Sequence, residues 1–308
     1  MEDMMSKNPA FNAGFPPPQH DPQARDDSHS FPLDGLDLSS VSDKELRELF
    51  STAPKLHDYG AVTVVRLSKL LVMKGGRGVH PGESRNMIFA AESLHLPVPK
   101  VHRAFTDAIR RSFDGRPEKA YFIVMDYVPG PTVEACWDSL ELRKRQIVAD
   151  QVAAMIDTMQ PRDLQLPPGP IGGSDGCKFE GPWFTDYGAG PFATLKDLET
   201  WCNHKIDVCI RFKQLPLNTP VFQFQKVVFT HQDIAPRNLI LDKQGTVWML
   251  DWGLAGAYPP GFEQAPLRGG SWNAEFAKMV LERLSDRQEH VTRQFAKIAY
   301  GLSVAAAL

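Results

Sequence analysis

The stretch Thr230-His231-Gln232-Asp233-Ile234-Ala235-Pro236-Arg237-Asn238, followed by Asp251-Trp252-Gly253, decides the fold class of this 308-residue chain. Residues 239–241 and 246–250, which lie between the two motifs, are short β-prone runs, and the turn residues between them predict a hairpin. The hairpin would bring Asn238 and Asp251 close together, because each lies at the outer end of a strand. A carboxylate, an amide and a second carboxylate are therefore expected in one small region.

Phosphoryl transfer from a nucleotide requires such a set of groups. One carboxylate accepts the proton of the attacking hydroxyl, and oxygen ligands hold Mg²⁺ against the phosphates. Asp233 is the candidate base, and Asn238 and Asp251 are the candidate metal ligands. A turn-capping role is the ordinary alternative for a loop aspartate such as Asp233. The spacing of all three residues favours the catalytic interpretation.

The pattern His-x-Asp-x-x-x-x-Asn, with Asp-Trp-Gly thirteen residues after the Asn, resembles the catalytic and metal-binding segments of the protein kinase-like superfamily. The chain is similar to the aminoglycoside phosphotransferase-like small-molecule kinases, especially their fungal-type members, over about residues 56–265. The resemblance implies a bilobal α+β fold, with a small β-rich N-lobe and a larger helical C-lobe. It also implies ATP and Mg²⁺ as cofactors, and a packed, non-catalytic role for His231.

Further segments of the first half match the same family. Residues 65–74 resemble the strand that carries the phosphate-binding lysine, here Lys74, although an edge-strand lysine facing water is the alternative. The resemblance implies Glu83 as its partner, but a Glu in a first helical turn also stabilises the helix dipole. Residues 125–130 resemble the segment that binds adenine, through the backbone of Asp126 and Val128. Only Gly60 stands where a glycine-rich loop would cover the phosphates.

Beyond these motifs, the composition of the chain predicts that it is organised in three parts. Residues 1–40 contain six prolines and seven acidic residues but only two basic ones, so a disordered, dispensable tail is expected. Residues 41–128 form the predicted N-terminal lobe, which starts with a capping box at Ser42, and residues 129–308 form the C-terminal lobe. Residues 161–192, rich in Gly and Pro, are expected to form a long surface loop.

Composition also excludes several classes of function. A net charge of -3 gives no reason to expect nucleic-acid binding, and no apolar run approaches the roughly 20 residues of a membrane span. The first thirty residues do not resemble a secretory signal. The four cysteines show no metal-binding spacing, so a reduced cytoplasmic protein is expected.

The predicted acceptor is the hydroxyl group of a small molecule. Protein kinases usually place a lysine two residues after the catalytic Asp, where this chain has Ala235. Only five residues separate Gly253 from Pro259-Pro260, so an activation segment does not fit. A protein kinase is therefore disfavoured. A catalytically inactive nucleotide-binding scaffold on the same fold is the stronger alternative, because a full glycine-rich loop is absent.

Overall fold

A computed structural model describes residues 20–111, 117–269 and 273–308. Contacts between Cα atoms divide the chain into two compact units: residues up to 80 with 101–127, and residues 81–100 with 128–308. The sequence predicted one boundary after residue 128, so the structure differs in assigning residues 81–100 to the second unit. The reason is a set of long-range hydrogen bonds. The N–H of Met249 donates to the carbonyl of Pro97 at 2.9 Å, and the Asn86 side chain binds the loop after Asp251.

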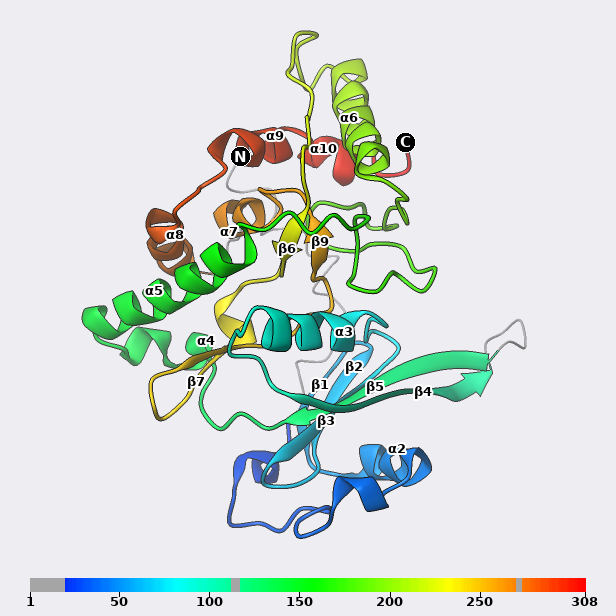
Figure 1. Cartoon of the computed structure of the whole chain (residues 1–308), viewed down its shortest axis with the longest axis vertical. Helices are drawn as coiled ribbons and strands as arrows, with labels where there is room; N and C mark the ends of the chain where they lie inside the picture. Colours follow the sequence, from blue (N-terminus) through cyan, green and yellow to red (C-terminus); the bar gives the residue numbers. More distant parts are fainter. Residues whose placement is uncertain (1–19, 112–116, 270–272) are drawn as a thin grey trace. The chain divides into compact units, whose positions relative to one another are not determined.

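The first unit contains a five-stranded antiparallel sheet in the order β1-β2-β3-β5-β4 (Figure 1). Its strands are β1 (Lys55–Tyr59), β2 (Val62–Arg66), β3 (Leu71–Gly76), β4 (Val101–Arg111) and β5 (Pro117–Asp126). In the sequence, the apolar runs at 62–67, 70–74 and 121–125 predict strands, and they correspond to β2, β3 and β5, the three inner strands. The two edge strands, β1 and β4, were not predicted. Edge strands carry more polar residues, and their apolar pattern is correspondingly weak.

Helix α2 (Asp43–Thr52) begins at the predicted capping box. The Ser42 N–H and hydroxyl donate to the Glu45 carboxylate, and the Glu45 N–H donates to the Ser42 hydroxyl. Two N–H groups at the helix start are thereby satisfied. Leu46 of this helix is fully buried in a core that also contains Met73 and Phe122, and Figure 1 shows α2 beside the sheet.

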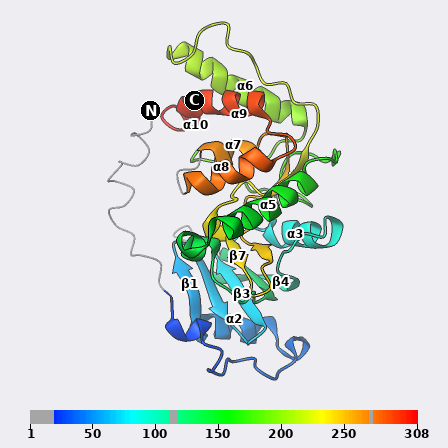
Figure 2. The same ribbon diagram turned by 90° about the vertical axis from the view of Figure 1, so that its left-hand side faces the viewer.

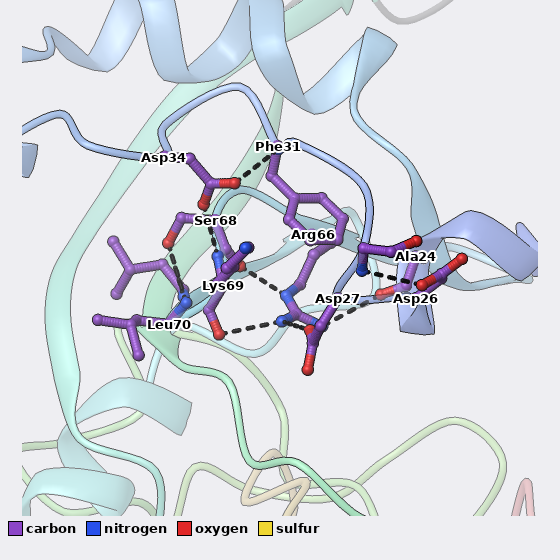
Figure 3. Close-up of polar contacts among 11 residues, drawn as sticks. Ala24, Asp26, Asp27, Phe31, Asp34, Arg66, Ser68, Lys69 and Leu70 are labelled. Carbon is purple, nitrogen blue, oxygen red and sulfur yellow. Dashed lines mark hydrogen bonds and ion pairs between the residues drawn. The ribbon is translucent and has the colours of Figure 1, made fainter.

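Residues 20–40 differ from the expected disordered tail, because they pack against the sheet around Arg66 (Figure 3). This segment includes the short 3₁₀ helices η1 (Pro22–Arg25) and η2 (Leu38–Ser40). The buried Arg66 guanidinium donates to the carbonyl of Ala24 at 3.1 Å and to the carboxylate of Asp27 at 2.8 Å. It also lies 4.6 Å from the centre of the Phe31 ring. An Arg on an inner strand needs such partners, because burying an unpaired charge is costly. Residues 1–19 of the predicted tail lie outside the described residues.

The second unit is mainly helical (Figure 2). Its helices are α3 (Glu83–Ile88), which continues as the π-helix η3 (Phe89–Ser93), α4 (Val133–Cys136), the 3₁₀ helix η4 (Trp137–Ser139), α5 (Leu142–Met159), α6 (Leu195–Arg211), the 3₁₀ helix η5 (Pro236–Asn238), α7 (Gln264–Gly269), α8 (Ala274–Arg283), α9 (Glu289–Lys297) and α10 (Ala299–Leu302). Its strands are β6 (Val228–Thr230), β7 (Leu239–Leu241), β8 (Val247–Met249) and β9 (Gly256–Tyr258). Helix α5 packs against α8, and α10 packs against α6 (Figure 2). None of the helices in the described ranges is both long and apolar enough to span a membrane.

Residues 161–192 lack regular helix or strand, as predicted for a long surface loop, and most of them are exposed or partly exposed. Composition did not predict that Phe179 and Phe184 of this segment are buried in a hydrophobic core of the second unit. The ring of Phe179 lies 6.0 Å from that of Tyr258, and the ring of Phe184 lies 6.0 Å from that of Phe262. Large aromatic side chains bury much apolar surface, which holds this Gly- and Pro-rich segment in place.

Candidate active site

The predicted catalytic loop, residues 231–238, follows strand β6, which pairs antiparallel with β9. His231 is fully buried, and its Nε2 donates to the carbonyl of Leu250 at 2.9 Å. Its Nδ1 accepts from the N–H of Asp233 at 3.2 Å, and its ring lies 4.6 Å from that of Trp252. His231 thus connects the start of the loop to the strand that precedes Asp251. These contacts agree with the packed role expected of it.

The Asp233 carboxylate is held through both of its oxygens. Oδ1 accepts from Nη2 of Arg237 at 2.5 Å, and Oδ2 accepts from Nδ2 of Asn238 at 2.8 Å. Nδ2 of Asn238 also donates to the backbone carbonyl of Asp233 at 2.9 Å. The 3₁₀ turn η5 makes these contacts possible, because it brings residues 237 and 238 back towards residue 233. The side chain of Asp233 remains a quarter exposed (26%), so it is accessible from solvent.

The hairpin of β7 and β8 joins Asn238 to the segment of Asp251 as predicted. Leu239 pairs with Met249, and the N–H of Leu250 donates to the carbonyl of Asn238 at 2.8 Å. Asp251 is exposed and has a φ of 62°, in the left-handed region that a non-glycine residue rarely adopts. Such conformations cost free energy and cluster at functional sites.

Asn238 and Asp251 suit the metal predicted for them. Both offer oxygen atoms, the ligands that Mg²⁺ prefers. The Asn238 amide donates to Asp233 through Nδ2, so Oδ1 is the atom with which it would hold a metal. Among the described parts of the chain, no group of three or more His, Cys, Asp and Glu is arranged to hold a metal ion. Two protein ligands are usual where nucleotide phosphates complete the coordination of Mg²⁺.

Asn86 of helix α3, which the sequence analysis did not single out, holds the loop after Asp251. Its Nδ2 donates to the carbonyl of Trp252 at 3.1 Å and to that of Ala255 at 2.8 Å. Its Oδ1 accepts from the N–H of Ile171 at 3.0 Å. The side chain is fully buried, and its hydrogen bonds supply partners for backbone groups of two distant segments. No local pattern signals this role, because the partners are far away in the sequence.

Glu263 is the second residue that sequence reasoning missed. Its buried carboxylate accepts from the backbone N–H groups of His231 and Gln232, the latter at 3.2 Å. Burial raises the pKa of Glu263 to about 7, and the two hydrogen bonds act in the opposite direction. Glu263 therefore holds the first two residues of the predicted catalytic loop in place. An acidic residue near the end of a Gly- and Pro-rich turn was visible in the sequence, but nothing there distinguished it from a solvated charge.

Three of the four predicted nucleotide-binding residues lie on separate helices or strands, and Val128 lies in the loop after β5. Lys74 lies on β3, the central strand, and is 7% exposed, so the edge-strand alternative is wrong. Glu83 is buried in the first turn of α3. Lys74 and Glu83 belong to different units, and their pairing remains a prediction. Asp126 ends β5 and binds Nε2 of His102 at 2.6 Å, and the buried Val128 begins the next segment of the second unit.

Comparisons with known proteins identify a family and a fold. The phosphotransferase enzyme family matches residues 81–298. The ADP-bound aminoglycoside phosphotransferase APH(2'')-Ib is similar in structure with 14% identity, a TM-score of 0.50 and coverage of 85% of this chain and 91% of that one. For aminoglycoside phosphotransferase APH(4)-Ia the identity is 17%, the TM-score 0.50 and the coverage 84% and 88%. Comparison with curated protein sequences returned no match.

The structural similarities show the fold, which is the bilobal kinase-like fold of the aminoglycoside phosphotransferases. The family match covers residues 231–238, the hairpin and Asp251, and extends over most of the chain. This chain belongs to the phosphotransferase enzyme family.

Proposed function

We propose that this phosphotransferase transfers the γ-phosphate of ATP to the hydroxyl group of a small molecule and requires Mg²⁺. One observation carries the proposal: Asp233 and Asn238 are hydrogen-bonded in a single loop, and the hairpin joins Asn238 to the segment of Asp251. The combination supplies a base and two metal ligands, which are the groups that phosphoryl transfer requires. The ADP bound to APH(2'')-Ib is consistent with a nucleotide as the phosphate donor.

In the proposed reaction Asp233 orients the acceptor hydroxyl and accepts its proton. The bonds from Arg237 and Asn238 keep the carboxylate in one orientation, which lowers the cost of reaching the reactive geometry. Lys74 and the backbone of Asp126 and Val128 are the proposed contacts to ATP. Asn238 and Asp251 would hold Mg²⁺, which offsets phosphate charge when it is bound.

A small-molecule acceptor is favoured over a protein. Strand β9 begins at Gly256, directly after the Asp251–Ala255 segment, so the chain has no long activation segment at this point. Ala235 also stands where protein kinases carry a lysine. The proposed location is the cytoplasm, because all four cysteines are free thiols and a reducing compartment preserves them.

The test is a screen of ATP and GTP consumption against amino-sugars, choline-like alcohols and other hydroxylated metabolites, with Asp233→Asn as the matched control. Asparagine keeps the shape of the side chain but removes the base. Turnover on any acceptor should fall about 100- to 10,000-fold. Binding of Mg-ATP should be unchanged, because Asp233 is not among the proposed nucleotide or metal ligands.

The alternative is a nucleotide-binding scaffold without activity. Wild-type protein that binds Mg-ATP but transfers phosphate to no acceptor, with Asp233→Asn indistinguishable from it, would establish the scaffold instead.

A further inference from the structure

The catalytic loop contains a cation that the family motif does not require. Arg237 lies four residues after Asp233, and its Nη2 is 2.5 Å from Oδ1 of that carboxylate. Position 235, where a lysine would stand in a protein kinase, carries only a methyl group. In residues 230–238 Arg237 is the single Lys or Arg.

The electrostatics of the proposed reaction require positive charge at this place. A triphosphate brings several negative charges towards Asp233, which is itself an anion. Two like charges about 4 Å apart repel by roughly 4 kcal/mol at an effective dielectric constant of 20. Positively charged groups placed in advance where negative charge develops are among the largest contributions to catalysis.

Arg237 has the chemistry and the access for this task. Its guanidinium is planar, always charged, and suited to carboxylate and phosphate oxygens together. The 3₁₀ turn η5 directs it to Asp233, so it lies at the reacting centre and not elsewhere on the surface. About a third of the side chain (34%) is exposed, which allows a ligand bound at Asp233 to contact it.

We propose that Arg237 is a catalytic residue that binds an oxygen of the transferring phosphoryl group while it holds Asp233. The inference rests on the proposed function. In the reaction the acceptor oxygen forms a bond to the γ-phosphorus, and the bond from that phosphorus to the β,γ-bridging oxygen breaks. ADP leaves with the electron pair, and the hydroxyl proton moves to Asp233. Arg237 gains and loses no proton, and acts by stabilising the charge of the transition state.

The experiment compares Arg237→Ala, Arg237→Lys and a matched control, Arg293→Ala. Arg293 forms an ion pair of the same i,i+4 spacing with Glu289, at 2.7 Å, on the surface of α9. On an acceptor that the wild type phosphorylates, Arg237→Ala should lower kcat about 100- to 1,000-fold, the usual loss for one donor to a transition-state oxygen. Affinity for Mg-ADP should stay unchanged, and Arg293→Ala should match the wild type.

Two further measurements separate catalysis from loop support. Methylguanidinium added to Arg237→Ala should restore part of kcat. Arg237→Lys should have an intermediate kcat, because a lysine keeps the positive charge but lacks the planar guanidinium that donates two parallel hydrogen bonds. In an Asp233→Asn background, Arg237→Ala should lower the remaining turnover further, because a phosphoryl contact does not act through Asp233.

Unchanged kcat in Arg237→Ala would overturn the proposal. The proposal would also be overturned if methylguanidinium did not restore kcat in Arg237→Ala and if Arg237→Ala had no effect in the Asp233→Asn background. Arg237 would then only position Asp233. Wild-type protein that phosphorylates no acceptor would overturn the proposed function itself, and this inference with it.

Discussion

Asp233, Asn238 and Asp251 are separated by at most eighteen positions, and the chain between them is a turn and a hairpin. Their proximity therefore depends on local structure. The side chains that support them come from farther away: Asn86 binds the carbonyl of Trp252, and Glu263 binds the N–H of His231. At the scale of the residue, the predicted site combines residues that local structure brings together with supporting residues that the tertiary structure supplies.

The two predicted metal ligands, Asn238 and Asp251, should differ in strength. We expect Asp251→Asn to abolish the tightening of ATP binding by Mg²⁺ more completely than Asn238→Ala, because a carboxylate is the stronger hard-oxygen ligand and balances the charge of the metal. Calorimetric titration of ATP with and without Mg²⁺ measures the effect. Asp207→Asn, which removes an exposed charge from α6, is the control. If Asp251→Asn behaves as the wild type, Asp251 is not a metal ligand.

Glu263 should make stability depend on pH. Its pKa is raised by burial from 4.5 to about 7, so between these values the folded protein keeps a proton that the unfolded chain has lost. The stability that this provides is complete below pH 4.5 and is lost as the pH rises through about 7. From pH 5 to pH 8 the wild type should lose up to about 3 kcal/mol relative to Glu263→Gln.

Urea unfolding of the wild type and Glu263→Gln at both pH values checks this prediction. Glutamine is uncharged and of the same length, so it retains an acceptor for the backbone N–H groups while removing the titration. Parallel pH dependence in the two proteins would show that Glu263 has an ordinary pKa in the folded state.

At the scale of the element, the N-terminal segment changes from a predicted tail to a part of the first unit. It covers Arg66 with the carbonyl of Ala24, the carboxylate of Asp27 and the ring of Phe31 (Figure 3). Its own backbone is tied to the sheet, since the N–H of Leu33 donates to the carbonyl of Leu67 at 2.8 Å. Removing the segment would expose a charged group and an apolar surface at once.

A chain that starts at Ser42 should therefore be less stable than the full-length protein. Phe31 and Leu33 are both buried, and each contributes about 1.5–3 kcal/mol, so a loss of about 3–6 kcal/mol in the free energy of unfolding is expected. Thermal or urea unfolding measures it. The control is a chain that starts at His20, which keeps every contact described for this segment. Equal stability of all three chains would show that the segment is dispensable.

At the scale of the whole molecule, the binding of a nucleotide can be followed through stability. Lys74, the predicted phosphate ligand, lies in the first unit, and Asn238 and Asp251, the predicted metal ligands, lie in the second. A nucleotide that binds only the folded protein stabilises it by mass action, by about 2.7 kcal/mol at a concentration of 100 times Kd. Saturating Mg-ATP should therefore raise the Tm of the wild type.

Lys74→Ala and Asp251→Asn should each reduce this rise in Tm at the same concentration of Mg-ATP. The first removes a positive charge expected to contact phosphate oxygens, and the second removes a ligand expected to hold the metal. Differential scanning fluorimetry over a range of Mg-ATP concentrations provides the comparison. An undiminished rise in Lys74→Ala would show that the first unit does not bind phosphate through this residue.

The sequence by itself determined the features that depend on neighbours in the chain. The hairpin between Asn238 and Asp251 could be predicted because its two β-prone runs and the turn between them are consecutive in the chain. The capping box at Ser42 and the apolar runs of β2, β3 and β5 have equally local signals, which the structure confirms.

Only the tertiary structure decided the features that join distant segments. These features are the edge strands β1 and β4, the N-terminal segment that covers Arg66, the buried aromatic residues of 161–192, and the hydrogen bonds of Asn86 and Glu263. Asn86 and Trp252 are 166 residues apart. The physical reason is that a buried polar group must find a partner wherever the fold supplies one, and such a partner leaves no periodic mark in the sequence.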